Sequence, residues 1–284
     1  MSIVVTGATG HLGRHVVEQL LEKVPAEQIT AVVRDEAKAA DLAERGVKLA
    51  VADYSAPATF DGVFAAGDKV LLISSSEVGN DRPGQHQVVI DAAKAAGVAL
   101  LAYTSAPGPL KAALADDHKA TEKALLASGL PYTLLRNSWY HENYTENLGP
   151  VLEHNAVVAA AGEGRVSSAS RADYAAAAVA VLTGEGHENQ TYELGGDVAW
   201  SFAEYAAELS AQTGKEIVYN NVPTEVLVGI LSGAGLPEPV AQVFAGVDES
   251  IAKGELEVSS GDLSRLIGRP TTPIAEAVSV ALKG

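Results

Sequence analysis

Short runs of β-branched and aliphatic residues alternate with longer stretches of helical periodicity along the first 135 residues of the chain. This alternation is typical of βαβ units, in which parallel strands form a sheet that helices cover on both faces. The apolar runs predict strands at residues 3–6, 29–33, 47–51, 69–73, 99–104 and 132–135. The stretches between them predict helices at residues 12–23, 35–45, 58–65, 85–96 and 116–128, each ending near a glycine or proline. We therefore expect an α/β fold with a doubly wound parallel sheet.

The regular alternation ends near residue 136. Beyond it, the pattern predicts a helix at residues 174–183, a strand at 190–195, a helix at 200–213 and a strand at 217–221. Ser201 is the expected N-cap of the helix at 200–213. We expect residues 1–136 to form one domain, to which residues of about 156–185 return. Residues 137–284 are then mainly a smaller C-terminal α/β domain that caps the substrate.

The charge balance narrows the classes of partner. Lys and Arg number 20, and Asp and Glu number 36, so the formal net charge is −16 at pH 7. Such a chain lacks the positive surface that nucleic acids and anionic membranes require, and we expect neither as a partner. The longest apolar stretches, such as residues 175–182, are shorter than the roughly 20 residues that span a bilayer. The chain has no cysteine, which is compatible with a reducing compartment, and we expect a cytoplasmic protein.

Three glycines lie between the first predicted strand and the first predicted helix. Gly7 permits a tight turn, Gly10 lets the backbone approach a diphosphate, and Gly13 allows the helix to pack closely on the strand. The alternative is that these glycines serve only a tight turn. Their place in the first unit of a βαβ series, where a helix start offers N–H groups to an anion, indicates a dinucleotide-binding Rossmann domain. We expect the whole turn to contact the cofactor, including Thr9, His11 and Leu12.

The residue after the second predicted strand indicates which dinucleotide binds. An Asp or Glu there would bind the ribose 2′-hydroxyl of NAD, whereas this chain has Arg34, with Lys38 one helical turn further on. The guanidinium of Arg34 can make a forked contact with a 2′-phosphate. We therefore expect NADPH to be preferred by about one to two orders of magnitude. The alternative is that Arg34 is a solvated charge beside Asp35.

Two further strand ends are expected beside the cofactor, because ligands of such sheets bind outside the carboxyl ends of the strands. Asp53 and Tyr54 follow the third predicted strand and are expected near the adenine. Ser74, Ser75 and Ser76 follow the fourth predicted strand and are expected along the cofactor. These residues, together with Arg34 and the glycine turn, make up the predicted cofactor site.

Several segments of the chain resemble a known family. They are residues 6–13 (Thr-Gly-Ala-Thr-Gly-His-Leu-Gly), Arg34, and residues 72–77, 102–105, 134–140, 169–174 and 268–272. The chain resembles the NADPH-dependent quinone oxidoreductases of bacterial type 2, within the NmrA-like branch of the atypical short-chain dehydrogenase/reductases. The resemblance spans nearly the whole chain. It implies a Rossmann domain with a small C-terminal domain, NADPH as the bound cofactor, and a small quinone-like molecule as the hydride acceptor.

One departure from the broader superfamily bears on the chemistry. Extended short-chain dehydrogenases carry a catalytic Tyr four residues before a catalytic Lys. Alignment on Glu122 and residues 129–133 places Leu114 and His118 at those two positions. A ketone needs a positioned acid in the transition state. Hydride addition to a quinone instead yields a delocalised phenolate that can take its proton later, so the missing tyrosine favours an activated acceptor.

Tyr140 is the expected proton donor, and His118 is the second catalytic candidate. His118 shares a helix face with Glu122, an arrangement that could turn the imidazole toward the cofactor ribose or the acceptor. The alternative is a histidine at the edge of the site without a chemical role. His141 is a weaker candidate for the donor.

Residues that follow the sixth predicted strand are expected at the nicotinamide end of the cofactor. Asn137 and Trp139 lie in this stretch, and an aromatic face suits stacking with a planar acceptor. The alternative for Trp139 is a packing role. Arg171 opens the Ala-rich helix and is expected to reach the cofactor, the alternative being an internal salt bridge with Asp173.

Two other functional readings stay open. NmrA-like relatives can bind the dinucleotide without turnover, as redox-sensing regulatory proteins, and the missing Tyr–Lys pair fits that role too. A reductase of another activated acceptor, such as a dye, an enone or a benzylic ether, is the second alternative. His11 and His15 have the spacing of a metal pair but no third ligand, so we expect no metal. A homodimer is compatible with the sequence.

Overall fold

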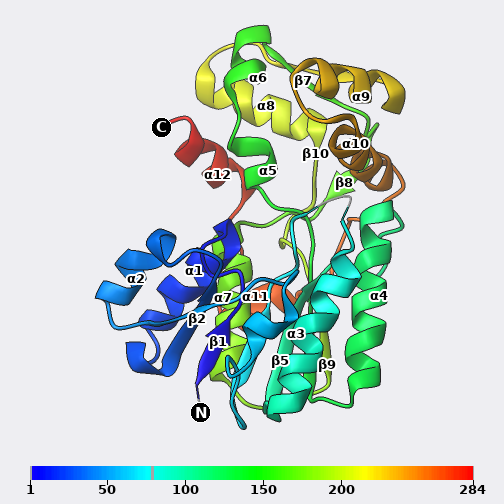
Figure 1. The fold of residues 1–284 in the computed structure, drawn as a ribbon. Coiled ribbons are helices and arrows are strands. Elements are labelled where there is room, and N and C mark those ends of the chain that lie inside the picture. Colours follow the sequence, from blue (N-terminus) through cyan, green and yellow to red (C-terminus); the bar gives the residue numbers. More distant parts are fainter. Residues whose placement is uncertain (1, 78–79, 284) are drawn as a thin grey trace. The chain divides into compact units, whose positions relative to one another are not determined.

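The computed structural model describes residues 2–77 and 80–283, which fold into two compact units (Figure 1). Unit 1 comprises Met1–Ala106, Asp117–Arg136 and Arg171–Tyr192. Unit 2 comprises Pro107–Asp116, Asn137–Ser170 and Glu193–Gly284. Each unit is therefore assembled from segments that lie far apart in the sequence.

A seven-stranded sheet runs through unit 1. Its strands are β1 (Ile3–Val5), β2 (Ile29–Val33), β3 (Lys48–Val51), β4 (Lys69–Leu72), β5 (Leu100–Ser105), β6 (Tyr132–Asn137) and β9 (Gln190–Leu194). They lie in the order β3-β2-β1-β4-β5-β6-β9, and each neighbouring pair from β3 to β6 is parallel. All three residues of β1 are buried, as expected for a strand that is covered on both faces. The predicted doubly wound sheet is confirmed, and β9 adds a seventh strand to the six expected.

Helices cover both faces of this sheet. On one face α1 (His11–Leu21) packs against α7 (Arg171–Thr183), with η1 (Ala26–Gln28) after α1. On the other face lie α3 (Arg82–Ala96) and α4 (Ala113–Ser128), and Ile90 and Leu125 share a buried core with Val70 and Leu101. The strand order reverses its direction between β1 and β4. The carboxyl ends of these two strands are therefore where an open α/β sheet binds its ligand.

Three helices of unit 1 differ from the prediction. The helix expected at residues 58–65 is wrong, since only the 3₁₀ helix η3 (Pro57–Phe60) forms. Gly62 has a φ of 76°, which ends any helix, and Phe60 and Phe64 are buried in a pattern that imitates a helical stripe. The helix expected at 35–45 divides into η2 (Glu36–Ala39) and α2 (Ala40–Glu44). Helix α3 begins earlier than expected because Asp81 accepts a hydrogen bond from the amide of Gly84.

Unit 2 contains two small sheets and several helices. In one sheet β7 (Ala156–Ala159) pairs in parallel with β11 (Val218–Asn221), and in the other β8 (Arg165–Val166) pairs antiparallel with β10 (Trp200–Ser201). The helices are α5 (Glu142–Thr145), α6 (Gly149–His154), α8 (Phe202–Thr213), α9 (Thr224–Gly233), α10 (Glu238–Ala252), α11 (Asp262–Ile267) and α12 (Ile274–Ala281). Ser201 caps α8 in a capping box with Glu204, so its predicted role is confirmed.

The segment that returns to unit 1 differs from the one expected. It is Arg171–Tyr192, whereas the sequence predicted about 156–185. The cause is strand pairing, because β7 and β8 find their partners in β11 and β10, which belong to unit 2. The backbone N–H and C=O groups of a strand require hydrogen-bonding partners on a neighbouring strand, and a pattern of apolar residues does not predict which strand that is.

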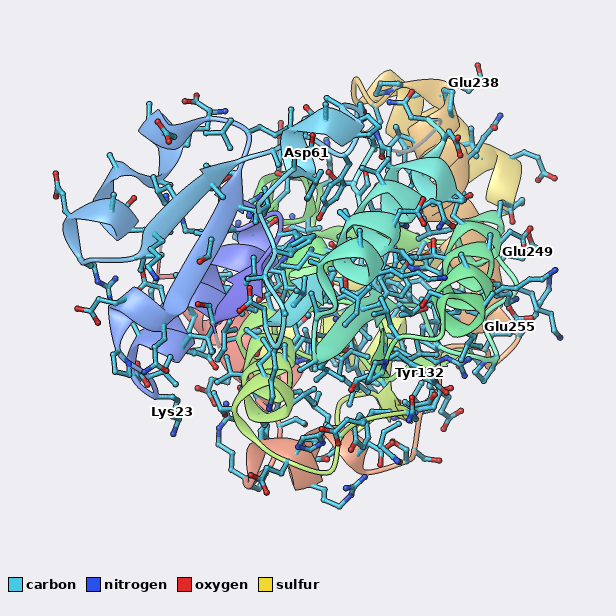
Figure 2. All side chains as sticks on the ribbon, turned by 60° about the horizontal axis from the view of Figure 1, so that its bottom comes forward. Lys23, Asp61, Tyr132, Glu238, Glu249 and Glu255 are labelled. Atoms are coloured by element: carbon cyan, nitrogen blue, oxygen red, sulfur yellow. The ribbon has the colours of Figure 1, made fainter. Side chains whose placement is uncertain are left out.

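The surface of the chain reflects its acidic composition. Asp61, Glu238 and Glu249 project outward from the ribbon (Figure 2). Across residues 2–77 and 80–283, no helix has both the length and the apolar character that crossing a membrane requires.

Candidate cofactor site

The turn after β1 has the shape that the glycine spacing predicts. Gly7 adopts a left-handed φ of 61°, and the amide of Gly10 donates to the carbonyl of Gly7 at 3.0 Å. A Cβ atom on Gly13 would overlap the carbonyl oxygen of Gly7 and lie 2.8 Å from Cα of Ala8. Only glycine fits at that position, because the clashing atoms belong to the backbone and cannot turn away.

The start of α1 is open to an anion. Gly10 is its N-cap, its first turn contains no acidic residue, and none of the side chains that the structure describes caps this end. The positive end of the helix dipole is therefore not neutralised by the helix itself. Thr9 is half-buried and His11 is exposed at this turn, whereas Leu12 buries its side chain and offers only its backbone. Such a turn fits a diphosphate.

Tyr54 connects the loops that follow three strands. Its hydroxyl donates to the carbonyl of Ile73 at 2.9 Å and lies 2.5 Å from Oγ1 of Thr6. Burial raises the pKa of Tyr54 well above its ordinary value, so the hydroxyl stays protonated. The side chain would lie 3.9 Å from a Cβ atom on Gly7 and so stands directly against the glycine turn. Asp53 shapes the same loop by accepting a hydrogen bond from the amide of Ser55 at 2.8 Å.

Arg34 is the first residue after β2 and pairs with Glu77. Its Nη1 lies 3.1 Å from Oε1 of Glu77, and its side chain is 69% exposed. Asp35, the partner considered from the sequence, instead caps η2 by accepting from the amide of Ala37. The charged partner of Arg34 in the structure is thus Glu77 and not Asp35, and most of the guanidinium side chain stays exposed to solvent. The contact between Arg34 and Glu77 could not be predicted from the sequence, because it depends on how close the loops after β2 and β4 lie.

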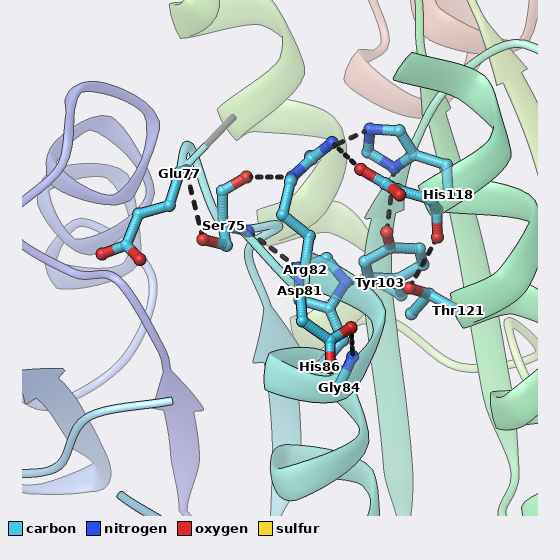
Figure 3. A network of polar contacts seen from close by, with 10 residues as sticks. Ser75, Glu77, Asp81, Arg82, Gly84, His86, Tyr103, His118 and Thr121 are labelled. Atoms are coloured by element: carbon cyan, nitrogen blue, oxygen red, sulfur yellow. Dashed lines mark hydrogen bonds and ion pairs between the residues drawn. The ribbon is translucent and has the colours of Figure 1, made fainter. Parts of the chain in front are cut away.

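The loop after β4 contains Ser74, Ser75 and Ser76. The amide of Ser74 donates to Oγ1 of Thr104 at 2.9 Å. Both backbone groups of Ser75 are bound by side chains of α3: its amide donates to Nε2 of His86 at 2.8 Å, and its carbonyl accepts from Nε of Arg82 at 2.8 Å (Figure 3). Ser76 follows this anchored residue and is exposed. Ser74 and Ser75 are thus anchored by side chains of β5 and α3.

His118 belongs to the same buried network. Its Nε2 lies 3.3 Å from Nη2 of Arg82, and its Nδ1 lies 2.8 Å from the hydroxyl of Tyr103 (Figure 3). A guanidinium only donates, so Nε2 accepts and Nδ1 carries the proton. Burial, and after it the charge of Arg82, lowers the pKa of His118 to about 3. The imidazole is therefore neutral at ordinary pH, and both of its nitrogens are engaged.

Glu122, one turn further along α4, has other partners. Its carboxylate accepts from Nε and Nη2 of Arg136 at 2.9 and 2.7 Å, and from the hydroxyl of Ser105 at 2.6 Å. This two-pronged ion pair joins α4 to the ends of β5 and β6. The imidazole of His118 is oriented by Tyr103 and Arg82, which the sequence did not suggest.

Asn137 is the last residue of β6, and with it the chain enters unit 2. Oδ1 of Asn137 is buried and has no hydrogen-bond partner among the described residues. Trp139 makes an edge-on contact with Phe244, their ring centroids lying 6.2 Å apart. His141 donates through Nε2 to the carbonyl of Thr272 at 2.9 Å, so its Nδ1 accepts from the hydroxyl of Ser168 at 2.8 Å.

The backbone positions of Tyr140 and Arg171 locate these two residues in the fold. Tyr140 forms an isolated β-bridge with Ala169, and Arg171 is the first residue of α7. Asp173, in the first turn of the same helix, is fully buried. Phe244 was missed by the sequence analysis, because more than a hundred residues separate it from Trp139 and nothing local marks it.

Comparison with known proteins now decides the family. Residues 7–185 match a family described as NAD(P)H-binding, which is more than half of the chain. The chain belongs to this NAD(P)H-binding family. The match begins at Gly7, the first glycine of the turn, so the cofactor class expected from the glycine spacing is confirmed.

Relatives over the full length support the family placement. Quinone oxidoreductase 2 of Escherichia coli (strain K12) is 49% identical over 281 residues, covering 98% of this chain and 97% of that protein. The crystal structure of an NADPH-dependent quinone oxidoreductase from Escherichia coli complexed with NADPH has a TM-score of 0.95 and 48% identity, covering 99% of both chains. Citrobacter sp. triphenylmethane reductase complexed with NADP(H) has a TM-score of 0.93 and 42% identity, covering 99% of this chain and 100% of that one. The family resemblance and the fold class predicted from the sequence are confirmed.

Proposed function

We propose that this chain is an NADPH-dependent quinone reductase, which passes hydride to a small quinone-like acceptor. The observation that carries the proposal is the glycine turn at the switch point of the sheet, with Arg34 at the end of the neighbouring strand. The similarity to the Escherichia coli quinone oxidoreductase supports the choice of NADPH and of a quinone.

The residues of unit 1 fit this cofactor. The turn at Gly7, Gly10 and Gly13, with Thr9, His11 and Leu12, would hold the diphosphate against the start of α1. Arg34 would bind the 2′-phosphate. Asp53 and Tyr54 would line the adenine end, and Ser74, Ser75 and Ser76 would lie along the dinucleotide. When bound, NADPH supplies the hydride, and the chain supplies position and electrostatics.

This reaction does not depend on a strong proton donor in the site. Hydride addition to a quinone leaves a delocalised phenolate, so a strong positioned acid is not required. We assign Tyr140 as the donor. His118 is better suited to a positioning role, because its one proton is bound to Tyr103 and its other nitrogen accepts from Arg82. His141 is engaged in the same way within unit 2.

Unit 2 offers groups that suit a planar acceptor. Trp139 and Phe244 present an aromatic pair, and aromatic faces stack with quinones. The unpartnered Oδ1 of Asn137 can accept one further hydrogen bond, which satisfies a buried oxygen that otherwise costs about 1–3 kcal/mol. In unit 1, Arg171 at the start of α7 is assigned to the cofactor.

The test is turnover with purified protein. NADPH oxidation, followed by the near-ultraviolet absorbance of the reduced nicotinamide, is expected to depend on added quinone and to be slower with NADH. If calorimetry shows that the protein binds NADPH, but no added acceptor leads to NADPH oxidation, the chain would be a redox-sensing regulatory protein and the enzymatic proposal would fail.

A triphenylmethane dye is the second candidate acceptor, because the Citrobacter sp. triphenylmethane reductase is 42% identical. Ranking quinones, a triphenylmethane dye and an enone by kcat/KM separates the two. A dye preferred over every quinone would replace the quinone in the proposal. The cytoplasmic location and the homodimer stay predictions, for cell fractionation and sedimentation to test.

A further inference from the structure

The ion pair between Arg34 and Glu77 lies across the centre of the candidate cofactor site. Arg34 follows β2 and Glu77 lies in the loop after β4, and β1 runs between these two strands. An ion pair that joins the two loops must therefore pass over the carboxyl end of β1. The glycine turn begins there, and the adenosine half of a dinucleotide lies there in sheets of this kind.

The carboxylate of Glu77 is held in place without the help of Arg34. Its Oε2 accepts from Nδ2 of Asn80 at 3.0 Å and from Nε2 of Gln85 at 2.9 Å. Gln85 also donates to Oγ of Ser55 at 3.1 Å, so its amide group is oriented with nitrogen toward both acceptors. Hydrogen bonds from Gln85 and Asn80, and the nearby charge of Arg34, lower the pKa of Glu77. A fixed negative charge therefore faces the guanidinium.

The backbone beneath Glu77 is anchored as well. Its amide donates to Oγ of Ser75 at 3.3 Å, and Ser75 is bound on both sides by Arg82 and His86. Figure 3 shows Glu77 pointing away from this buried network. The position of its carboxylate is thus set by α3 and its loop, independently of any ligand.

We propose that Glu77 is a specificity-determining residue, a built-in counter-ion that competes with the 2′-phosphate of NADPH for Arg34. The proposal rests on the assignment of Arg34 to that phosphate. A phosphate monoester carries up to two negative charges and can displace a carboxylate from a guanidinium, whereas a 2′-hydroxyl cannot. NADPH therefore has to break the pair, while NADH binds with the pair intact.

The expected effect has a definite sign and a small size. Glu77→Gln keeps the shape of the side chain and removes its charge, so Arg34 no longer has to be released. The dissociation constant of NADPH is expected to fall about two- to five-fold, and that of NADH to stay the same. A five-fold change corresponds to about 1 kcal/mol, which is the upper range for an exposed ion pair. Added salt should reduce the difference in NADPH affinity between Glu77→Gln and the native chain, because both side chains of the ion pair are solvent-accessible and their interaction is screened.

The experiment is calorimetric titration of NADPH and NADH into the full chain and four variants. The variants are Glu77→Gln, Arg34→Ala, the double variant, and Glu18→Gln. Glu18 forms a similar exposed pair with Arg45 in unit 1, at 2.6 Å, so its variant has the same charge change elsewhere. We expect tighter NADPH binding for Glu77→Gln alone, no such gain in the Arg34→Ala background, and no change for Glu18→Gln.

Each other outcome has a defined meaning. If Glu77→Gln binds NADPH as tightly as the native chain does, Glu77 does not compete with the 2′-phosphate for Arg34. The same conclusion follows if Glu77→Gln still tightens NADPH binding in the Arg34→Ala background. Both results leave Arg34 as the phosphate ligand. Weaker NADH binding in Glu77→Gln also overturns the competition, because the carboxylate would then be binding the ribose 2′-hydroxyl. If Arg34→Ala weakens NADPH and NADH equally, the phosphate assignment fails and the competition fails with it.

Discussion

The guanidinium of Arg82 lies 3.3 Å from Nε2 of His118, and both side chains are buried. Arg82 also bonds to Ser75 and forms an ion pair with Asp117 at 3.2 Å. A cation beside an imidazole opposes its protonation, and burial opposes it further. The same holds for His86, whose pKa burial and Arg82 lower to about 3. Two neutral histidines thus support the loop that borders the candidate cofactor site.

Because His86 and His118 are neutral in the folded chain, we expect the free energy of unfolding to fall in mild acid. Their folded pKa values of about 3 lie below the ordinary value of 6.5, so between these limits only the unfolded chain takes up their protons. The stabilising contribution is present above pH 6.5 and is lost as the pH falls toward 3. Each histidine adds at most about 1.4 kcal/mol per pH unit to this slope.

Urea unfolding between pH 7 and pH 5 measures that slope. His118→Gln can still donate and accept one hydrogen bond each, and it is expected to reduce the slope by the share of one histidine. An unchanged slope in this variant would mean that His118 titrates normally in the folded chain.

Gly13→Ala should abolish cofactor binding. The added methyl group overlaps the carbonyl of Gly7 and presses on Ala8, so the glycine turn has to move. Overpacking of this kind costs about 1–3 kcal/mol of stability. The matched control is Gly246→Ala in α10, where the new methyl group meets open space and should stabilise the helix by about 0.5–1 kcal/mol. Calorimetry and thermal unfolding of both variants check the contrast, and normal NADPH binding by Gly13→Ala would contradict it.

Arg34→Ala should raise the dissociation constant of NADPH by about ten- to a hundred-fold, because the variant loses a charge-assisted contact worth ~1.5–3 kcal/mol. NADH, which lacks the 2′-phosphate, should lose little. Arg45→Ala removes another exposed arginine of unit 1 that pairs with Glu18, and it should change neither affinity. The ratio of the two dissociation constants in each variant is the measurement. A ratio in Arg34→Ala equal to that of the native chain would contradict the assignment.

Tyr140→Phe should lower kcat with quinones by less than about a hundred-fold, the lower end of what a general acid contributes. The phenolate product can take its proton from water, so the hydroxyl is helpful without being essential. NADPH affinity should be unchanged.

Tyr144→Phe is the matched control, because the hydroxyl of Tyr144 is buried without a partner among the described residues. Its removal should leave kcat unchanged and stability unchanged or higher by about 1 kcal/mol. A thousand-fold loss for Tyr140→Phe would point to an acceptor that is not activated.

The elements that local pattern controls were predictable. The strands β1 to β6 and the glycine turn follow from apolar runs and from the spacing of Gly7, Gly10 and Gly13, since burial and backbone sterics act on neighbouring residues. The helix expected at 58–65 failed for the opposite reason. Phe60 and Phe64 have helical spacing, but the conformation of Gly62 between them decides the backbone.

By itself, then, the sequence determined the doubly wound sheet, the glycine turn after β1 and the presence of a cation after β2. Only the tertiary structure decided the partner of that cation, Glu77, which lies 43 residues further along the chain. It also decided that His118 faces Arg82 and Tyr103, that Phe244 meets Trp139, and that β9 joins the sheet. The physical reason is that side-chain pairing and strand order depend on which distant segments meet in space. A hydrophobic pattern records only that a residue is buried, and the rest follows from packing.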